Sequence, residues 1–419
     1  MIGLEYDSDV VLNGRFYYQG KFQDLSVSVS QGIITRIGKF LKAERIVHLP
    51  HAVLPASTDT HVHFRDPGET DKEDFRSGTT SAIYGGTTTV FDMPNNRVPV
   101  TDYEVFESKL SAISGKAYAD FGLYSLFTGS NKDLLDKRTS GLKIFMGGST
   151  NAAAIGDPDM VATDFLRNYE NPVVFHAEDA SCLSAHSMEE HDCRDHNMAR
   201  PIECEQKAIE KAVSFRLKKG VIAHLSFPYD IQTNYLFEVT PHHLLLNDES
   251  VNDQWGKVNP PLRDRGTQEK LLALFLAGKF SLLTSDHAPH SYENKEDFEH
   301  AASGIIGVET RIPLMLSLVK RKILSMDLFL KTACSNPAAL FGLRKGMLQV
   351  GYSADFMCVD FSSEKPIDQD RLHSKVTVTP FNGYSAIFPS DVVMRGETVL
   401  EKYELIEDHL GRFISNDRK

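Results

Sequence analysis

Short apolar runs alternate with segments of helical periodicity through the middle of the chain. Residues 203–219 are a representative helical segment. Strands that alternate with helices are typical of βαβ units around a parallel sheet, and eight parallel strands close a barrel. The pattern therefore predicts an α/β protein with a (β/α)8 barrel. An open, doubly wound sheet is the alternative, but no glycine-rich phosphate loop follows the first run to support it. The eight runs cover residues 52–63, 87–93, 120–127, 141–146, 172–177, 221–226, 237–246 and 280–286.

At both ends of the chain the pattern changes to short strands without helices between them. Strands are predicted at residues 9–12 and 25–29, with turn signals at Asn13-Gly14 and Gln31-Gly32. The same pattern returns at residues 354–360 and 391–394. Neither end is long enough for a stable sheet alone, so we expect the two to pair into one small β domain. The chain then divides into residues 1–51, the barrel at 52–345, and 346–419.

The composition of the 419-residue chain excludes several classes of function. A net charge of −12 and a pI of about 5.7 give no electrostatic support for nucleic-acid binding. No stretch approaches the roughly 20 apolar residues of a membrane helix, and the N-terminus has no signal-peptide pattern. The five cysteines are an odd number in a large chain, which indicates no disulfide framework and favours a reducing cytoplasm.

Polar side chains end four of the predicted barrel strands. His61 and His63 end the first, and because residues i and i+2 of a strand face the same side, both can converge on one metal ion. His176, His224 and Asp286 end the fifth, sixth and eighth runs. Each alone is equally well explained as a hydrogen-bonded core residue. Together, at the strand ends where barrel active sites lie, they indicate a metal centre, and these ligand types suit zinc while leaving manganese, cobalt and iron open.

Lys143 lies within the apolar run 141–146. A buried amine is costly unless it is paired or neutralised, so a lysine paired with a carboxylate or reaching solvent is one interpretation. The other is a carbamylated lysine, an amine that has captured CO2 and bridges two metal ions. His61 and His63 would then bind one ion, and His176 and His224 the other.

Several motifs resemble those of the dihydroorotase family, in the family's order over most of residues 52–345. The match is closest to the long-chain, class I dihydroorotases of archaea and many bacteria. The resemblance implies a zinc-dependent cyclic amidohydrolase with a composite β-sandwich domain built from both chain ends. The motifs are His61-Val62-His63-Phe64-Arg65-Asp66-Pro67-Gly68, Asp92-Met93-Pro94-Asn95-Asn96, Thr240-Pro241-His242-His243-Leu244, Asn259-Pro260-Pro261-Leu262-Arg263 and Thr284-Ser285-Asp286-His287-Ala288-Pro289-His290.

The resemblance also implies roles for individual residues. Two Zn²⁺ ions are expected, bridged by carbamylated Lys143, and Asp286 is expected to pass a proton from water to the departing nitrogen. The remaining metal ligands are His61, His63, His176 and His224. The substrate carboxylate is expected at Arg65, Asn95 and His290, and the substrate ring near Asn259, Ser303 and Gly304.

The implied reaction is the reversible cyclisation of N-carbamoyl-L-aspartate to L-dihydroorotate, the third step of pyrimidine (UMP) biosynthesis. The residue types agree, because bound metal activates water and polarises an amide carbonyl, and the planar guanidinium of Arg65 suits a carboxylate. An allantoinase or hydantoinase is one alternative, but these usually lack the arginine after His-x-His-Phe. A catalytically inactive scaffold subunit is a second, but such proteins typically lose metal ligands, and all six candidates are present here.

Three further features receive simpler interpretations. His242 and His243 are expected on the seventh strand, either as packing residues or as residues that contact the metal ligands. A homo-oligomer is expected by fold-level analogy, and association with aspartate transcarbamoylase is compatible with an active enzyme. Cysteines and histidines in residues 182–204 could form a second zinc site, but their spacings fit no familiar pattern, which favours a loop near the active site that includes His196 and Arg200. The cysteines and histidines are Cys182, Cys193, Cys204, His186, His191 and His196.

Overall fold

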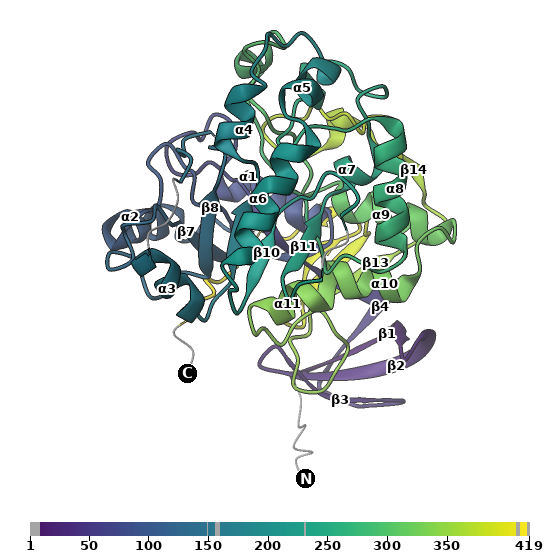
Figure 1. The fold of residues 1–419 in the computed structure, drawn as a ribbon. Coiled ribbons are helices and arrows are strands. Elements are labelled where there is room, and N and C mark those ends of the chain that lie inside the picture. The colour runs from purple at the N-terminus through teal and green to yellow at the C-terminus, as the bar shows by residue number, and fades with distance from the viewer. Residues whose placement is uncertain (1–8, 149, 156–159, 230–231, 408–410, 417–419) are drawn as a thin grey trace, which may run out of the picture.

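A computed structural model describes residues 9–148, 150–155, 160–229, 232–407 and 411–416 (Figure 1). Its centre is a sheet of eight parallel strands in sequential order, β5 to β12. A bridge between Val62 and His287 closes the sheet, and the His63 N–H donates to the His287 carbonyl at 2.7 Å. The predicted (β/α)8 barrel is thus confirmed. The strands are β5 (Ser57–Val62), β6 (Thr87–Asp92), β7 (Asp120–Leu126), β8 (Gly141–Phe145), β9 (Val173–His176), β10 (Gly220–Ile222), β11 (Leu236–Val239) and β12 (Leu282–Leu283).

Helices cover the outside of the barrel, and side chains near their first residues define where several begin. Asp74 accepts from the Ser77 N–H at 2.8 Å and starts α1, and Asp102 caps α2 in the same way. Within the described residues no helix follows β7 or β10. The helices are α1 (Phe75–Tyr84), α2 (Tyr103–Ile113), α3 (Met160–Asn168), α4 (Ala180–Ala185), α5 (Cys193–Ala199), α6 (Ile202–Ser214), α7 (Pro241–Leu245), α8 (Arg265–Leu276), α9 (Arg311–Lys320), α10 (Met326–Leu330) and α11 (Asn336–Leu340).

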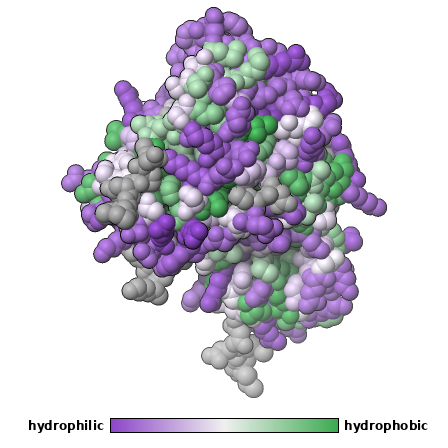
Figure 2. Space-filling view, in the orientation of Figure 1, coloured by the Kyte–Doolittle hydropathy of each residue, from purple (hydrophilic) through white to green (hydrophobic). Residues whose placement is uncertain are grey.

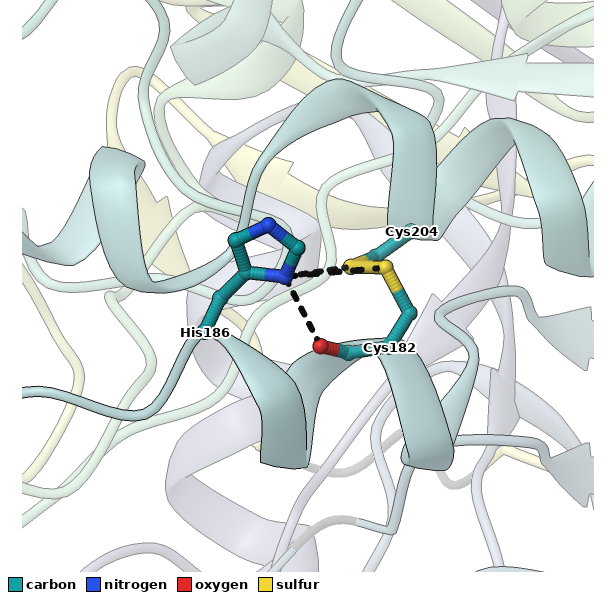
Figure 3. A group of neighbouring side chains, drawn as sticks. All are labelled: Cys182, His186 and Cys204. Carbon is teal, nitrogen blue, oxygen red and sulfur yellow. Dashed lines mark hydrogen bonds between the residues drawn. A yellow bond between two sulfur atoms is a disulfide. The ribbon is translucent and has the colours of Figure 1, made fainter.

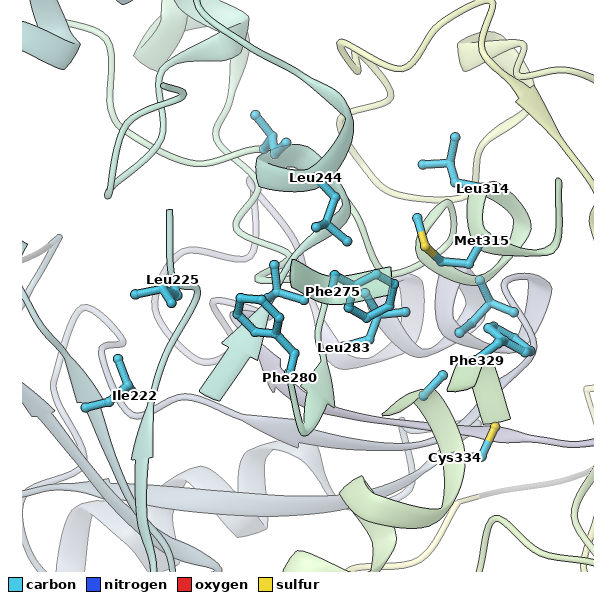
Figure 4. Packing of buried hydrophobic residues seen from close by; sticks show 14 of the residues in the cluster. Ile222, Leu225, Leu244, Phe275, Phe280, Leu283, Leu314, Met315, Phe329 and Cys334 are labelled. Carbon is cyan, nitrogen blue, oxygen red and sulfur yellow. The ribbon is translucent and has the colours of Figure 1, made fainter. Parts of the chain in front are cut away.

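The main hydrophobic core fills the space between the barrel strands and this helical layer. Phe275 of α8 packs beside Phe280, and Phe329 of α10 lies near Met315 of α9 (Figure 4). All but Phe280, which is 5% exposed, have no exposed surface, as expected for side chains between the barrel strands and the helices. The face of the molecule shown in Figure 2 is mostly hydrophilic, with smaller hydrophobic areas. None of the described helices has the length and apolar character that crossing a membrane requires.

Strands from both ends of the chain form a second eight-stranded sheet, with β1–β3 at the bottom of the view in Figure 1. β13 pairs with β4 on one side and β16 on the other, so it joins the two ends. The prediction that both ends build one β domain is confirmed. Two further short strands, β14 (Lys365–Pro366) and β15 (Ser385–Ala386), pair separately. The sheet contains β1 (Val10–Tyr18), β2 (Lys21–Ser30), β3 (Ile33–Gly38), β4 (Arg45–Pro55), β13 (Phe356–Val359), β16 (Asp391–Met394), β17 (Glu397–Glu401) and β18 (Glu404–Leu405).

Two local predictions about the strands are wrong. Asn13-Gly14 is no turn: β1 continues through it, and the irregularity appears as a bulge between Asn13 and Arg15. In the seventh run, the strand ends at Val239 because the Thr240 side chain accepts from the backbone N–H of residue 243 and starts α7. His242 and His243 therefore lie on a helix instead of the seventh strand.

The cysteine prediction also needs correction, because Cys182 and Cys204 form a disulfide. They lie on α4 and α6, and the fold brings their Cα atoms to 5.3 Å, within the usual range for a cross-link. The count and spacing of cysteines along the chain do not reveal this approach. Cys193, Cys334 and Cys358 are free and buried.

Candidate active site

The predicted site residues converge at the carboxyl end of the barrel strands. Eleven of the twelve line one cavity, and the twelfth, His290, contacts Arg65 beside it. Arg65, His224 and Asp286, which follow three different strands, all have left-handed backbone conformations, with φ of 59°, 36° and 48°. Such conformations cost about 1–2 kcal/mol for a residue with a side chain, and they turn the chain sharply where each strand ends.

Four imidazoles and one carboxylate meet in this cavity. His61 Nε2 and His63 Nε2 lie 3.3 and 3.2 Å from Asp286 Oδ1. His176 Nδ1 lies 3.1 Å from His224 Nε2. Burial lowers the pKa of all four histidines, so the imidazoles are neutral near pH 7.

The outer nitrogens of three imidazoles face oxygen atoms that fix their tautomers. Burial raises the pKa of Glu238 to about 8 and Lys143 opposes this effect; when Glu238 is ionised, His61 Nδ1 donates to its Oε2 at 2.8 Å. His63 Nδ1 donates to Asn95 Oδ1 at 2.7 Å. His176 Nε2 donates to a Glu178 oxygen at 2.7 Å. A neutral imidazole that donates through one nitrogen has a lone pair on the other. Three lone pairs therefore face the centre of the cavity.

Glu178 is itself held by Arg200. Arg200 Nε donates to Glu178 Oε1 at 3.0 Å, and Nη2 donates to Oε2 at 2.5 Å. Burial alone would raise the pKa of Glu178, but Arg200 and His176 outweigh it and hold this pKa well below its usual range. A bidentate ion pair thus fixes the carboxylate that orients His176.

Lys143 completes the cluster from the middle of β8. Its side chain is fully buried, and Nζ donates to His61 Nε2 at 3.4 Å. Burial lowers the pKa of Lys143, although Glu238 and Asp286 oppose this effect. A lowered pKa increases the fraction of neutral amine, the form that reacts with CO2.

This donor set fits divalent metal. Lone pairs of neutral imidazoles together with a carboxylate oxygen are the ligands zinc prefers, and in the absence of a cation they would repel one another. The outer oxygen partners complete the histidine–carboxylate pattern that orients metal ligands in proteins.

Beside the cluster, Arg65 is a buried cation without a matching acceptor. The residue is 3% exposed, and among the described residues its Nε and Nη1 have no hydrogen-bond partner. Nη2 lies 3.2 Å from His290 Nε2, but that nitrogen also lies 3.0 Å from the Ser303 carbonyl. When His290 Nε2 carries the proton and donates to Ser303, it cannot also accept from Arg65, and Nη2 then lacks an acceptor among the described residues as well. Burial lowers the pKa of Arg65, which adds to the cost of this arrangement.

Asn95, Asn259 and Gly304 occupy defined places around the cavity. Both polar groups of Asn95 are engaged, because Nδ2 donates to the Thr150 carbonyl at 3.1 Å while Oδ1 accepts from His63. His196 Nε2 lies 2.9 Å from Asn259 Oδ1. Gly304 has φ 145°, and a Cβ there would lie 2.4 Å from the Ala288 carbonyl oxygen, so only glycine fits.

Sequence reasoning missed the two carboxylates that orient the histidines. Glu238 is fully buried inside the apolar strand β11, and the argument applied to Lys143 could have found it. Glu178 follows His176 by two residues, a weaker signal. His196 and Arg200 do lie near the site, but the expected loop is wrong there, because His196 is in α5 and Arg200 caps its C-terminal end.

The comparisons with known proteins agree with this architecture. The chain belongs to the amidohydrolase family, whose model matches residues 52–399. It is 55% identical over 402 residues to a dihydroorotase of Thermoplasma volcanium, covering 96% of both chains. It is 52% identical over 411 residues to a dihydroorotase of Thermoplasma acidophilum, covering 98% of this chain and 99% of the relative. The resemblance to the dihydroorotase family is confirmed.

Among solved structures, the chain is similar to an L-hydantoinase (dihydropyrimidinase) from Arthrobacter aurescens. The TM-score is 0.90 at 25% identity, covering 97% of this chain and 100% of the other. A D-hydantoinase (dihydropyrimidinase) from Thermus sp. has a TM-score of 0.85 at 23% identity, covering 95% and 96%. Because the Thermus protein is only 23% identical to this chain, its similarity supports the fold alone.

Proposed function

We propose that this chain acts as a dihydroorotase, which interconverts L-dihydroorotate and N-carbamoyl-L-aspartate. The observation that carries the proposal is the buried, unmatched guanidinium of Arg65 beside the histidine cluster. A guanidinium fork binds a carboxylate through two parallel hydrogen bonds. Dihydroorotate carries a ring carboxylate, whereas a hydantoin or allantoin ring does not.

We infer that two Zn²⁺ ions complete the cluster, with Lys143 carbamylated between them. His61, His63, His176, His224 and Asp286 are the other proposed ligands. The metal, when bound, lowers the pKa of water and polarises an amide carbonyl. The convergent lone pairs and the lowered pKa of Lys143 support this assignment.

The chain's own residues then orient the substrate and move the proton. Arg65, Asn95 and His290 bind the carboxylate, and Asn95 Oδ1 also holds His63 in its tautomer. Asn259 and Gly304 bound the position of the ring. In hydrolysis, Asp286 accepts a proton on a carboxylate oxygen and delivers it to the ring nitrogen as the amide bond breaks. Cyclisation follows the same path in reverse.

An allantoinase or hydantoinase is the alternative within the family, and the likeness to the Arthrobacter L-hydantoinase is the observation in its favour. A neutral ring would leave Arg65 without its acceptor, which favours dihydroorotate. An inactive scaffold is disfavoured because all six candidate ligands lie together in the cavity.

The experiment is turnover by the purified protein of L-dihydroorotate, allantoin and hydantoin in parallel, with metal quantified in the same sample. We expect dihydroorotate hydrolysis with about two zinc per chain, lost with a chelator and restored by Zn²⁺. Turnover of allantoin or hydantoin without turnover of L-dihydroorotate would assign the protein as an allantoinase or hydantoinase instead. A metal-replete protein without activity on any of the three would overturn it.

The remaining proposals concern the pathway, cellular compartment, oligomeric state and partner of the enzyme. The activity proposed here places the protein in pyrimidine biosynthesis. The cytoplasm remains the predicted compartment; three free cysteines agree with it, and the Cys182–Cys204 disulfide does not. A homo-oligomer and an association with aspartate transcarbamoylase remain predictions. Gel filtration with light scattering, with and without aspartate transcarbamoylase, tests both.

A further inference from the structure

Two cysteines and a histidine converge between α4 and α6, outside the cavity described above. His186 caps the C-terminal end of α4, and its Nδ1 lies 3.9 Å from the sulfur of Cys182 and 3.9 Å from that of Cys204 (Figure 3). The three ligand atoms lie within 4.8 Å of one another. The other cysteine and histidines of residues 182–204 do not share this position: Cys193 contacts the Asp253 carbonyl, and His196 contacts Asn259.

We propose that, in its reduced form, this cluster is a zinc site formed by Cys182 Sγ, Cys204 Sγ, His186 Nδ1 and one water molecule. A dithiol reductant supplies two electrons and two protons, breaks the S–S bond and becomes a disulfide itself. Binding of Zn²⁺ then displaces one proton from each thiol. The disulfide and the zinc complex are alternative states of one site.

The two bonded sulfurs must separate, whereas the histidine nitrogen is already close to its place. Zinc binds thiolate sulfur at about 2.3 Å and imidazole nitrogen at about 2.0 Å in a tetrahedron, which sets S···N separations of about 3.5 Å and an S···S separation of about 3.8 Å. Nδ1 is already 3.9 Å from each sulfur. Cys204 is fully buried, so the partly exposed Cys182 provides the rotation that separates the two sulfurs.

The carboxylate of Glu203 lies near Nε2 of His186, the ring nitrogen that faces away from the sulfurs. His186 Nδ1 donates to the Cys182 carbonyl at 2.9 Å in the disulfide form. Metal at Nδ1 shifts the proton to Nε2, which lies 3.8 Å from Glu203 Oε1. Glu203 would then orient His186 as carboxylates orient metal-bound histidines generally.

The cluster opens onto solvent, so both metal and reductant can reach it. It lines a surface groove of about 590 Å³ together with Glu203, Glu210 and Lys207. The charge of Lys207 is paired with Asp179 at 2.8 Å, which leaves two acidic side chains to attract a cation. The groove has room for the water at the fourth zinc position.

Cobalt titration of the full chain tests the proposal, because thiolate–cobalt charge transfer gives a near-ultraviolet band that the histidine and carboxylate ligands of the barrel cannot give. We expect the band, and about one extra Co²⁺ per chain, in reduced protein but not in oxidised protein. Cys182→Ser should abolish it, while Cys193→Ser should retain it. His186→Ala should weaken binding, whereas the exposed His191→Ala should not.

Two results would overturn the proposal and leave a structural cross-link only. One is the absence of the band in reduced wild-type protein. The other is a band of equal strength in Cys182→Ser. Should that variant fail to fold, the comparison of oxidised and reduced wild type decides alone. None of these readouts depends on turnover, so the result is independent of the proposed activity.

Discussion

Replacing Arg65 with methionine tests the anion site directly. Two buried guanidinium nitrogens, Nε and Nη1, have no partner, and each hydrogen bond to a charged group contributes about 1.5–3 kcal/mol. Losing both costs about 3–6 kcal/mol, or about 10²–10⁴-fold in kcat/KM for L-dihydroorotate. Binding of 5,6-dihydrouracil, the same ring without the carboxylate, should be unchanged.

The assay compares kcat/KM for dihydroorotate with the inhibition constant of dihydrouracil in Arg65→Met and in Arg97→Met. Arg97 is exposed, so it controls for loss of a positive charge nearby. Removing an unmatched buried charge should also leave the ligand-free protein at least as stable toward urea. Equal losses for both ligands, or no loss for dihydroorotate, would refute the carboxylate role.

Three other predictions follow from the same structure. Glu238→Gln should weaken metal binding about 10–100-fold in a chelator competition, and the exposed Glu269→Gln should not; equal affinities would show that Glu238 does not orient His61. Ring closure consumes one proton, so the equilibrium ratio of dihydroorotate to N-carbamoyl-L-aspartate should rise about tenfold for each unit of pH decrease, and a ratio independent of pH would exclude this reaction. Burial would raise the pKa of Glu190, but His196 and Lys257 bring it from 4.5 to about 2. A depressed pKa stabilises the fold above about pH 4.5, and this contribution is lost as the pH falls toward 2. Urea unfolding of Glu190→Gln should therefore show a smaller loss of stability between pH 7 and pH 3 than wild type, and parallel losses would contradict the pairing.

The barrel and the convergence of its polar residues could be predicted because both depend on local periodicity. Each strand is a short apolar run, and chain order alone places the carboxyl ends of parallel strands at one edge. His61, His176 and His224 therefore came together as expected, although two of them lie 48 residues apart. Motif resemblance added Arg65 and Asn95, which periodicity does not distinguish from other loop residues.

The wrong predictions concern places where a short sequence motif is outweighed by contacts with distant parts of the chain. Asn13-Gly14 is a good turn sequence, but pairing with β2 and β4 on both sides keeps the strand extended through it. The run after Val239 is apolar enough for a strand, yet the Thr240 cap starts a helix. The Cys182–Cys204 cross-link depends on how two helices pack, which sequence spacing does not encode.

The distribution of charge explains how an acidic protein can bind an acidic substrate. The net charge of −12 repels a dianion at long range, so attraction must arise where solvent screening is weak. Glu238 and Glu178 face the outer nitrogens of the histidines, so their carboxylates are occupied with orienting the ligands and lie away from the centre of the cavity. Arg65, by contrast, has no carboxylate within hydrogen-bonding distance in the described part of the chain. Among the described residues no acceptor reaches Nε and Nη1 of Arg65, so a carboxylate that the substrate brings can satisfy them. The cost of a buried charge then becomes selectivity for a ring that carries a carboxylate.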